Sequence, residues 1–92
     1  MATVNQATNL AAAATTVIAT ASPGRTLVSV ICNKPGTTDT VTVYDGVTAG
    51  GRKIAGIAAP TVGANFNYNA FCPNGICVVV GGTAGDYTIV WR

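Results

Sequence analysis

The sequence has no His and no Glu, and only eight of its 92 residues carry a formal charge. General acid–base catalysis needs a group that changes protonation near neutral pH, usually His, Glu, Asp or Lys. The carboxylate side chains are Asp39, Asp45 and Asp86, and each lies beside a glycine-containing turn sequence, where Asp ordinarily hydrogen-bonds the turn backbone. We therefore expect that this protein is not an enzyme, and we assign it no catalytic residue.

Metal and cofactor motifs are also missing. The cysteines at positions 32, 72 and 77 lack the paired spacing of a zinc site. No loop holds the several carboxylates that calcium prefers, and no glycine-rich phosphate-binding motif occurs. We expect neither a metal ion nor a cofactor.

Long apolar runs and clustered charge are absent as well. No stretch of about 18 apolar residues appears, as a transmembrane helix would require. No Lys or Arg precedes Arg25, so the positive start of a signal peptide is missing. The net charge of +2 is scattered, and Arg52–Lys53 is the one adjacent basic pair. We expect no membrane and no nucleic acid among the partners, because nucleic-acid binding favours clustered Lys and Arg.

What the sequence does contain is a β pattern from residue 15 onward. Short runs of β-branched and alternating residues are separated by Gly, Pro and Asp turns at intervals of about 8–12 residues, which is typical of a sandwich or small barrel. Apolar residues on both faces of Arg25–Asn33 predict a central strand. The seven expected strands are Thr15–Thr20, Arg25–Asn33, Asp39–Asp45, Arg52–Ile57, Asn65–Phe71, Ile76–Val80 and Tyr87–Arg92.

Residues 1–14 differ from the rest, since Val4 and Leu10 are their only bulky apolar residues. We interpret them as an extended N-terminal arm, which either orders against a neighbouring subunit or frays as a terminus. We expect residues 15–92 to form a single β-sandwich domain. The predicted fold is all-β, an antiparallel sandwich or small barrel of about seven strands preceded by that arm. A domain this small has a limited core, and oligomerisation is the leading source of additional stability.

The strongest turn signal is the segment from Cys72 to Cys77, which contains Pro73 and the Asn74–Gly75 pair. It predicts a hairpin that joins the strands on either side. The two cysteines flank the turn, so a disulfide across it is geometrically possible. The alternative is that all three cysteines, Cys32 included, are small apolar fillers.

The aromatic residues alternate with polar ones, which predicts core positions for Phe66, Tyr68, Phe71, Tyr87 and Trp91. The alternative is an exposed stacking platform for sugars or bases. Asn65, Asn67 and Asn69 form a polar stripe on the opposite face, which is either solvated or a hydrogen-bonding contact in an oligomer.

Residues 15 to 92 resemble small β-rich virion proteins of tailed bacteriophages, including head-decoration (cement) and head-fibre proteins. The likeness lies in a Thr/Ala-rich lead, several strand-and-turn segments and a terminal strand. These are Pro23–Arg25, Leu27–Ile31, Val41–Gly46 with Ile54–Ala55, Phe71–Ile76, Val78–Gly82 and Tyr87–Trp91. Their turn-and-strand chemistry is shared by many β proteins, and the resemblance carries no catalytic residue over to this chain.

The resemblance implies a capsid decoration protein that binds the outer surface of the shell and stabilises it, often as a trimer. The expected partners are the major capsid protein and further copies of the chain as a homotrimer. The expected location is the capsid surface of a virion assembled in the host cytoplasm. The alternatives are a head-fibre, tail or baseplate component, or a carbohydrate-binding sandwich that exposes Tyr44, Phe71 or Trp91 on a concave face.

Overall fold

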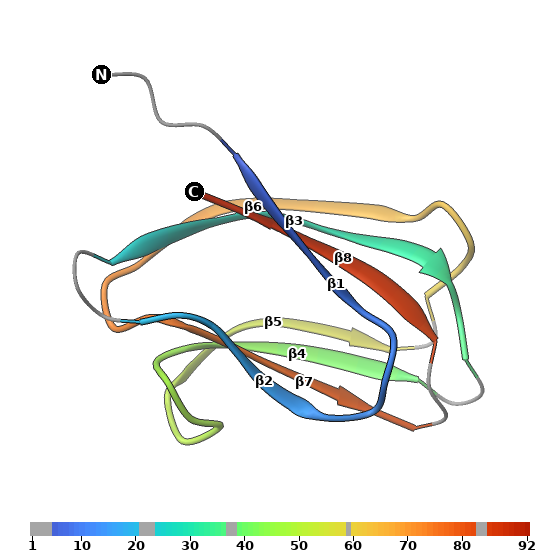
Figure 1. The fold of residues 1–92 in the computed structure, drawn as a ribbon, viewed down its shortest axis with the longest axis horizontal. Coiled ribbons are helices and arrows are strands. Elements are labelled where there is room, and N and C mark those ends of the chain that lie inside the picture. Colours follow the sequence, from blue (N-terminus) through green and yellow to red (C-terminus); the bar gives the residue numbers. More distant parts are fainter. Residues whose placement is uncertain (1–4, 21–23, 37–38, 59, 83–84) are drawn as a thin grey trace.

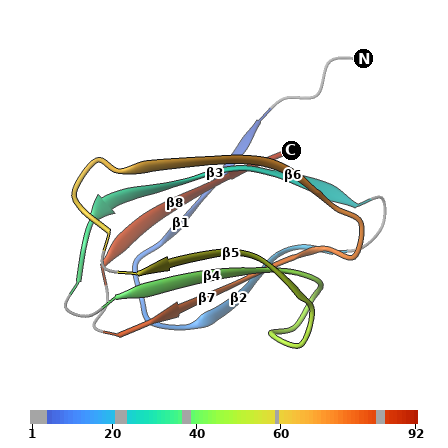
Figure 2. The same ribbon diagram turned by 180° about the vertical axis from the view of Figure 1, so that it is seen from behind.

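A computed structural model, which describes residues 5–20, 24–36, 39–58, 60–82 and 85–92, shows two facing sheets of four strands (Figures 1 and 2). In spatial order the first sheet contains β1 (Gln6–Leu10), β8 (Asp86–Trp91), β3 (Arg25–Lys34) and β6 (Asn65–Cys72). The second contains β2 (Thr15–Ala19), β7 (Ile76–Gly81), β4 (Thr40–Asp45) and β5 (Arg52–Ala58). All neighbouring strands are antiparallel. The predicted all-β sandwich is confirmed, and no described segment is a helix able to cross a bilayer.

The strand orders β1-β8-β3-β6 and β2-β7-β4-β5 are those of a jelly roll, in which two Greek keys fold over one another. Of the seven connections, β4 to β5 stays within one sheet and the other six pass from one sheet to the other. The predicted position of β3 is confirmed, because it lies between β8 and β6. Alternation explains the rest of the core: Val41 and Val43 of β4 are fully buried, whereas Thr40 on the opposite face is exposed.

The N-terminal segment departs from the prediction. Residues 6–10, which were assigned to the arm, form β1 and pair with β8 from Gln6–Trp91 to Leu10–Tyr87. The sandwich therefore has eight strands rather than seven. The physical reason is that β1 is held mainly by backbone hydrogen bonds to a distant strand, and in the strand itself only Leu10 is buried. Residues 1–4 of the arm lie outside the described residues.

The predicted hairpin at Cys72–Cys77 is wrong. The turn forms, with Gly75 at φ +114° and its N–H donated to the Cys72 carbonyl (3.3 Å). However, β6 and β7 belong to different sheets, so the turn carries the chain across the sandwich. The local sequence specifies the turn, but the sheet that the next strand enters depends on the partners available to β7. Those partners are β2 and β4.

Candidate interaction surfaces

The three Asp residues serve three separate structural roles, beginning with Asp39 in the core. Asp39 is 1% exposed, and its Oδ2 accepts a hydrogen bond from the hydroxyl of fully buried Tyr87 (2.5 Å) and another from the Gly36 N–H (2.8 Å). Its Oδ1 is buried without a hydrogen-bond partner among the described residues. Burial, followed by the bond to Asp39, raises the pKa of Tyr87 well above its usual value of 10.0. This pair joins β8 to the start of β4.

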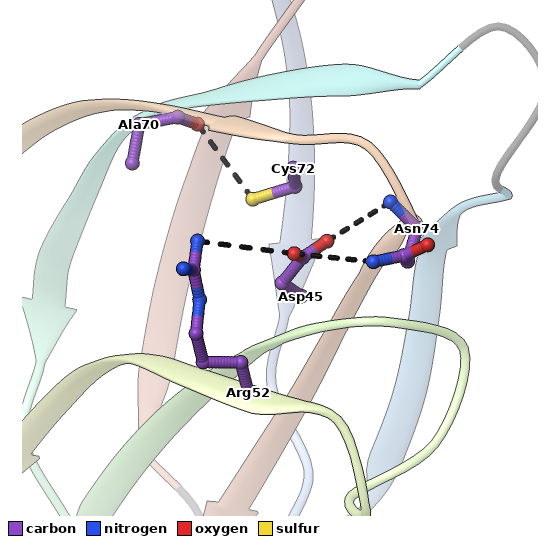
Figure 3. A network of polar contacts seen from close by, with 5 residues as sticks. All are labelled: Asp45, Arg52, Ala70, Cys72 and Asn74. Carbon is purple, nitrogen blue, oxygen red and sulfur yellow. Dashed lines mark hydrogen bonds and ion pairs between the residues drawn. The ribbon is translucent and has the colours of Figure 1, made fainter.

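Asp45 holds the crossover turn (Figure 3). Its Oδ1 accepts the backbone N–H of Asn74 (3.0 Å), and its Oδ2 accepts the Asn74 side-chain amide (3.4 Å). Gly46 also donates its N–H to the Gly75 carbonyl (3.1 Å). Arg52 lies 4.0 Å from Asp45, but its side chain is 74% exposed, so this ion pair adds little. Asp45 therefore anchors the end of β4 to the turn between β6 and β7.

Asp86 lies on the outer face of the first sheet. Its Oδ1 accepts hydrogen bonds from the side-chain amides of Asn9 (2.5 Å) and Asn33 (3.0 Å), and Asn33 also donates to the Thr88 hydroxyl (2.8 Å). These bonds, with that from Asn33 contributing most, lower the pKa of Asp86. The cluster links β1, β8 and β3 through side chains. No group of three metal-ligating side chains occurs in the described ranges.

All three cysteines are free and fully buried. Cys32 and Cys72 face the core between the sheets. Cys77 lies between the core residues Ile76 and Val78 of β7 and therefore on the other face of that strand, where it is paired with Val17 and Tyr44. Burial raises the pKa of each thiol above its usual 9.0. The structure thus has the cysteines as apolar fillers, without a disulfide between Cys72 and Cys77.

We expect the folded protein to resist thiol alkylation. At pH 7.5, iodoacetamide should modify the three cysteines slower than a free thiol by on the order of 100-fold, since the thiolate is disfavoured and access requires local opening. Mass spectrometry would count the adducts. In denaturant without a reductant, all three should react; a single adduct would reveal a disulfide and contradict the structure.

The aromatic predictions are confirmed with one exception. Tyr87 is fully buried, while Phe66, Tyr68 and Trp91 are partly buried and pack against the core. Phe71 was predicted in the core but is 59% exposed. It follows Asn69, whose positive φ of 50° marks an irregularity in β6, and its place in the strand is on the outward face.

A sugar-stacking role is not favoured by the position of Trp91. The indole N–H donates to the Thr8 hydroxyl (3.1 Å), and the guanidinium of Arg25 lies 5.7 Å from the ring centroid. This cation–π contact and the packing against the core occupy the ring. Among the three aromatic residues considered for stacking on a sugar, Phe71 is exposed and Tyr44 is half-buried.

Charge is segregated between the two ends of the sandwich. The end formed by the β6–β7 turn and the start of β3 contains four of the five cationic side chains, together with Asp45: Arg25, Arg52, Lys53 and Arg92. The opposite end holds Lys34, Asp39 and Asp86. One end is therefore basic and the other slightly acidic, a distribution that the scattered charges of the sequence did not reveal.

The sheet edges are the second notable surface. The four edge strands are β1 and β6 in one sheet and β2 and β5 in the other. Proteins usually protect such edges with Lys, Pro or a bulge, because unpaired backbone groups invite another strand. β5 carries Arg52 and Lys53, whereas β1, β2 and β6 contain no charged residue and no proline, so the first sheet is the one that is free of charge at both edges. Asn65, Asn67 and Asn69 of β6 are exposed, as the polar stripe predicted.

Comparisons with known proteins add a likeness of fold. No protein-family model and no curated protein sequence matches this chain. Among solved structures, the chain is similar in fold to one that carries the description "Bacillus endospore appendages form a novel family of disulfide-linked pili". The TM-score is 0.52 at 15% sequence identity, and the match covers 96% of this chain and 84% of the other. At that identity the likeness concerns the fold alone.

Proposed function

We propose that this protein is a structural subunit that works by self-association, and specifically a virion protein of a tailed bacteriophage that binds the outer capsid surface and stabilises the shell. The observation that carries the proposal is the jelly roll with two charge-free edges, β1 and β6, in one sheet. Such edges favour pairing with other chains. Jelly rolls are widely used in viral capsid and lectin domains.

Two further observations support a structural role. The subunit of similar fold belongs to appendages described as pili, which are themselves assemblies. The basic end of this chain provides Arg25, Arg52, Lys53 and Arg92 for an acidic surface. A capsid shell that presents carboxylates to this end would orient the subunit by charge complementarity. The three cysteines are buried and therefore do not contribute to the surface that would contact the capsid.

A deletion of the gene from the phage tests the proposal. We expect heads that lack the protein to release DNA at a lower temperature than complete heads. The reason is that each bound subunit adds contacts to the closed shell, and these contacts are lost when the shell opens. DNA release during heating would be followed with an intercalating dye, and addition of the purified protein should restore the original temperature. Purified particles that contain no copy of the chain would overturn the proposal.

The position of the subunit separates the alternatives. The β4–β5 loop is exposed at Val47–Gly50 and can take a short epitope tag. Immunogold labelling of tagged particles should decorate the head surface at regular density. Label confined to the tail or baseplate would replace the decoration role with a tail or baseplate role, and label at the distal ends of head projections would indicate a head fibre.

A further inference from the structure

The two edge strands of the first sheet, β1 and β6, are both free of charge and lie on opposite sides of that sheet. In the order β1-β8-β3-β6, neighbouring strands are antiparallel, so β1 and β6 run in opposite directions. A second copy placed beside the first, with its β1 against β6, therefore continues the antiparallel alternation. The other sheet is less suited to this, since its edge strand β2 is free of charge but its other edge strand, β5, carries two cations.

Defined residues of β6 direct their backbone N–H and C=O groups away from β3, toward the open edge of the sheet. Cys32 of β3 donates its N–H to the Ala64 carbonyl and accepts the N–H of Gly63 (2.8 Å each), so Cys32 directs its backbone groups toward the β6 side. Because hydrogen-bonded and non-hydrogen-bonded pairs alternate in an antiparallel ladder, the pair Val30–Phe66 is bonded in the same way. It follows that Asn65 and Asn67 direct their N–H and C=O groups to the open edge.

The same reasoning applies to β1. Arg92 and Thr26 exchange two backbone hydrogen bonds (2.9 and 2.7 Å), so Arg92 faces β3. Alternation along β8 then turns Ile89 and Trp91 toward β1, where they pair with Thr8 and Gln6. The residues between these, Ala7 and Asn9, direct their backbone groups away from β8 and toward solvent.

We propose that β6 of one copy binds β1 of a second copy edge to edge, with Asn67 opposite Ala7 and Asn65 opposite Asn9 of the second copy. This register joins the residues whose backbone groups are open on both strands, and each pair exchanges two hydrogen bonds. The regular part of β6 before Asn69, which adopts a positive φ, is the four residues 65–68, and in this register they face residues 6–9 of β1.

Side chains fit this register on both faces of the extended sheet. On the outer face, Asn65 lies opposite Asn9 of the second copy, so the row of Asn9, Thr88, Ile31 and Asn65, which is polar at both ends, meets the next subunit through two Asn side chains. On the inner face, Phe66 and Tyr68 are only partly buried because β6 has no neighbour on that side. Thr8 and Gln6 of the second copy would cover them.

The inference deepens the proposed function, on which it rests, by naming the contact between copies. Since different surfaces meet, the contact is head-to-tail and generates a closed ring or an open filament according to the rotation between copies. A single contact between two segments of four residues is small, which places it among weak, transient interfaces. Many such contacts on a shell act together through high effective concentration.

Cysteine crosslinking tests the register directly. Paired residues in such a ladder have Cα atoms about 5.5 Å apart, within the range of a disulfide. Ala7→Cys and Asn67→Cys proteins, mixed and oxidised with copper phenanthroline, should form dimers, and the double variant should form a ladder of oligomers on a non-reducing gel. Ala7→Cys mixed with Asn65→Cys is off-register and should crosslink several-fold less. Dimers of either single variant alone, or equal yields in both mixtures, would overturn the proposal.

A charge on the edge provides an independent test. Both Asn67 and Thr15 are exposed, Asn67 on β6 and Thr15 on the edge strand β2 of the other sheet. Asn67→Lys should abolish the chemical crosslinking of concentrated protein, whereas Thr15→Lys should leave it unchanged. The crosslinking reagent must be short and must not react with amines, so that the new Lys side chains do not themselves become crosslinked. The reverse result would assign the contact to β2. If crosslinking is lost but the Asn67→Lys protein still binds heads, the contact between copies is established separately from the capsid role. If crosslinking is unaffected, the contact between copies is disproved, and this result leaves the proposed binding to heads untouched.

Discussion

Replacing Gly75 by Ala is expected to destabilise the fold by about 3 kcal/mol, since it combines backbone strain with a steric clash. Gly75 has φ +114°, a region that residues with a Cβ rarely adopt. A Cβ there would lie 2.7 Å from the Ala19 carbonyl oxygen and 3.2 Å from that of Gly46. Neither is a flexible side-chain end, so backbone must move. Because a small domain has only about 5–15 kcal/mol of stability, the loss should be evident in urea-induced unfolding followed by circular dichroism.

Gly63 provides the matched control. It also has a positive φ, of +79°, but a Cβ there meets nothing within 4 Å. Gly63→Ala should therefore cost only the conformational part, roughly 1 kcal/mol. Equal losses for the two variants would show that the close approach at Gly75 has no energetic consequence and would contradict the crossover geometry.

Tyr87→Phe should lower the stability at pH 7 by about 2 kcal/mol, because a buried carboxyl group loses a hydrogen-bond donor that water cannot replace. The hydroxyl of Tyr87 lies 2.5 Å from Asp39 Oδ2, and both side chains are almost fully buried. The other oxygen of that carboxyl group has no partner among the described residues, so the Gly36 N–H would be the remaining donor. The free energy of unfolding, from urea titrations of both proteins, measures the loss.

The pH dependence of the same pair has a defined sign. The pKa of Tyr87 is raised in the folded state, so its contribution is fully present below the unfolded value of 10.0 and is lost as pH rises above it. The gap between wild type and Tyr87→Phe should therefore narrow above pH 10, by about 1.4 kcal/mol per pH unit for one group. The buried thiols, with raised pKa values, cause a further decline above about pH 9 that both proteins share.

Tyr68→Phe separates the two contributions. Burial alone raises the pKa of Tyr68, which is half-buried in β6. This variant also removes an ionisable hydroxyl, but it takes no donor from Asp39, so it should cost much less than Tyr87→Phe at pH 7. A Tyr87→Phe protein as stable as the Tyr68→Phe protein, or a gap that widens with pH, would refute the assigned role of the buried pair.

Local patterns predicted the strands that bury side chains at alternating positions. Val41 and Val43 in β4, and the two apolar faces of β3, are determined by residues two apart, which share a face of any strand. The same alternation separates Phe71 from Phe66, Tyr68 and Ala70, and applied strictly it would have placed Phe71 on the exposed side. The error came from grouping residues by aromatic character rather than by position.

Contacts between distant residues explain the other differences. The hydrogen bond of Asp39 joins residues 48 positions apart, and those of Asn9 to Asp86 and Asn74 to Asp45 span 77 and 29 positions. Asp beside a turn is the same local signal in all three cases, so sequence alone could not separate a buried anchor from a surface cluster. β1 was missed for a similar reason, since its partner β8 lies at the opposite end of the chain.

The sequence by itself determined that the chain is a charge-poor β protein with glycine-rich turns and no His, because composition and two-residue periodicity are local properties. Only the tertiary structure decided which strands meet: β1 pairs with β8, β7 lies in the second sheet, and β1 and β6 are the two edges of the first sheet. Backbone hydrogen bonds between strands are nearly the same for every residue type. Pairing is therefore settled by which arrangement buries Leu27, Ile89 and the other core side chains together, and that is a property of the whole chain.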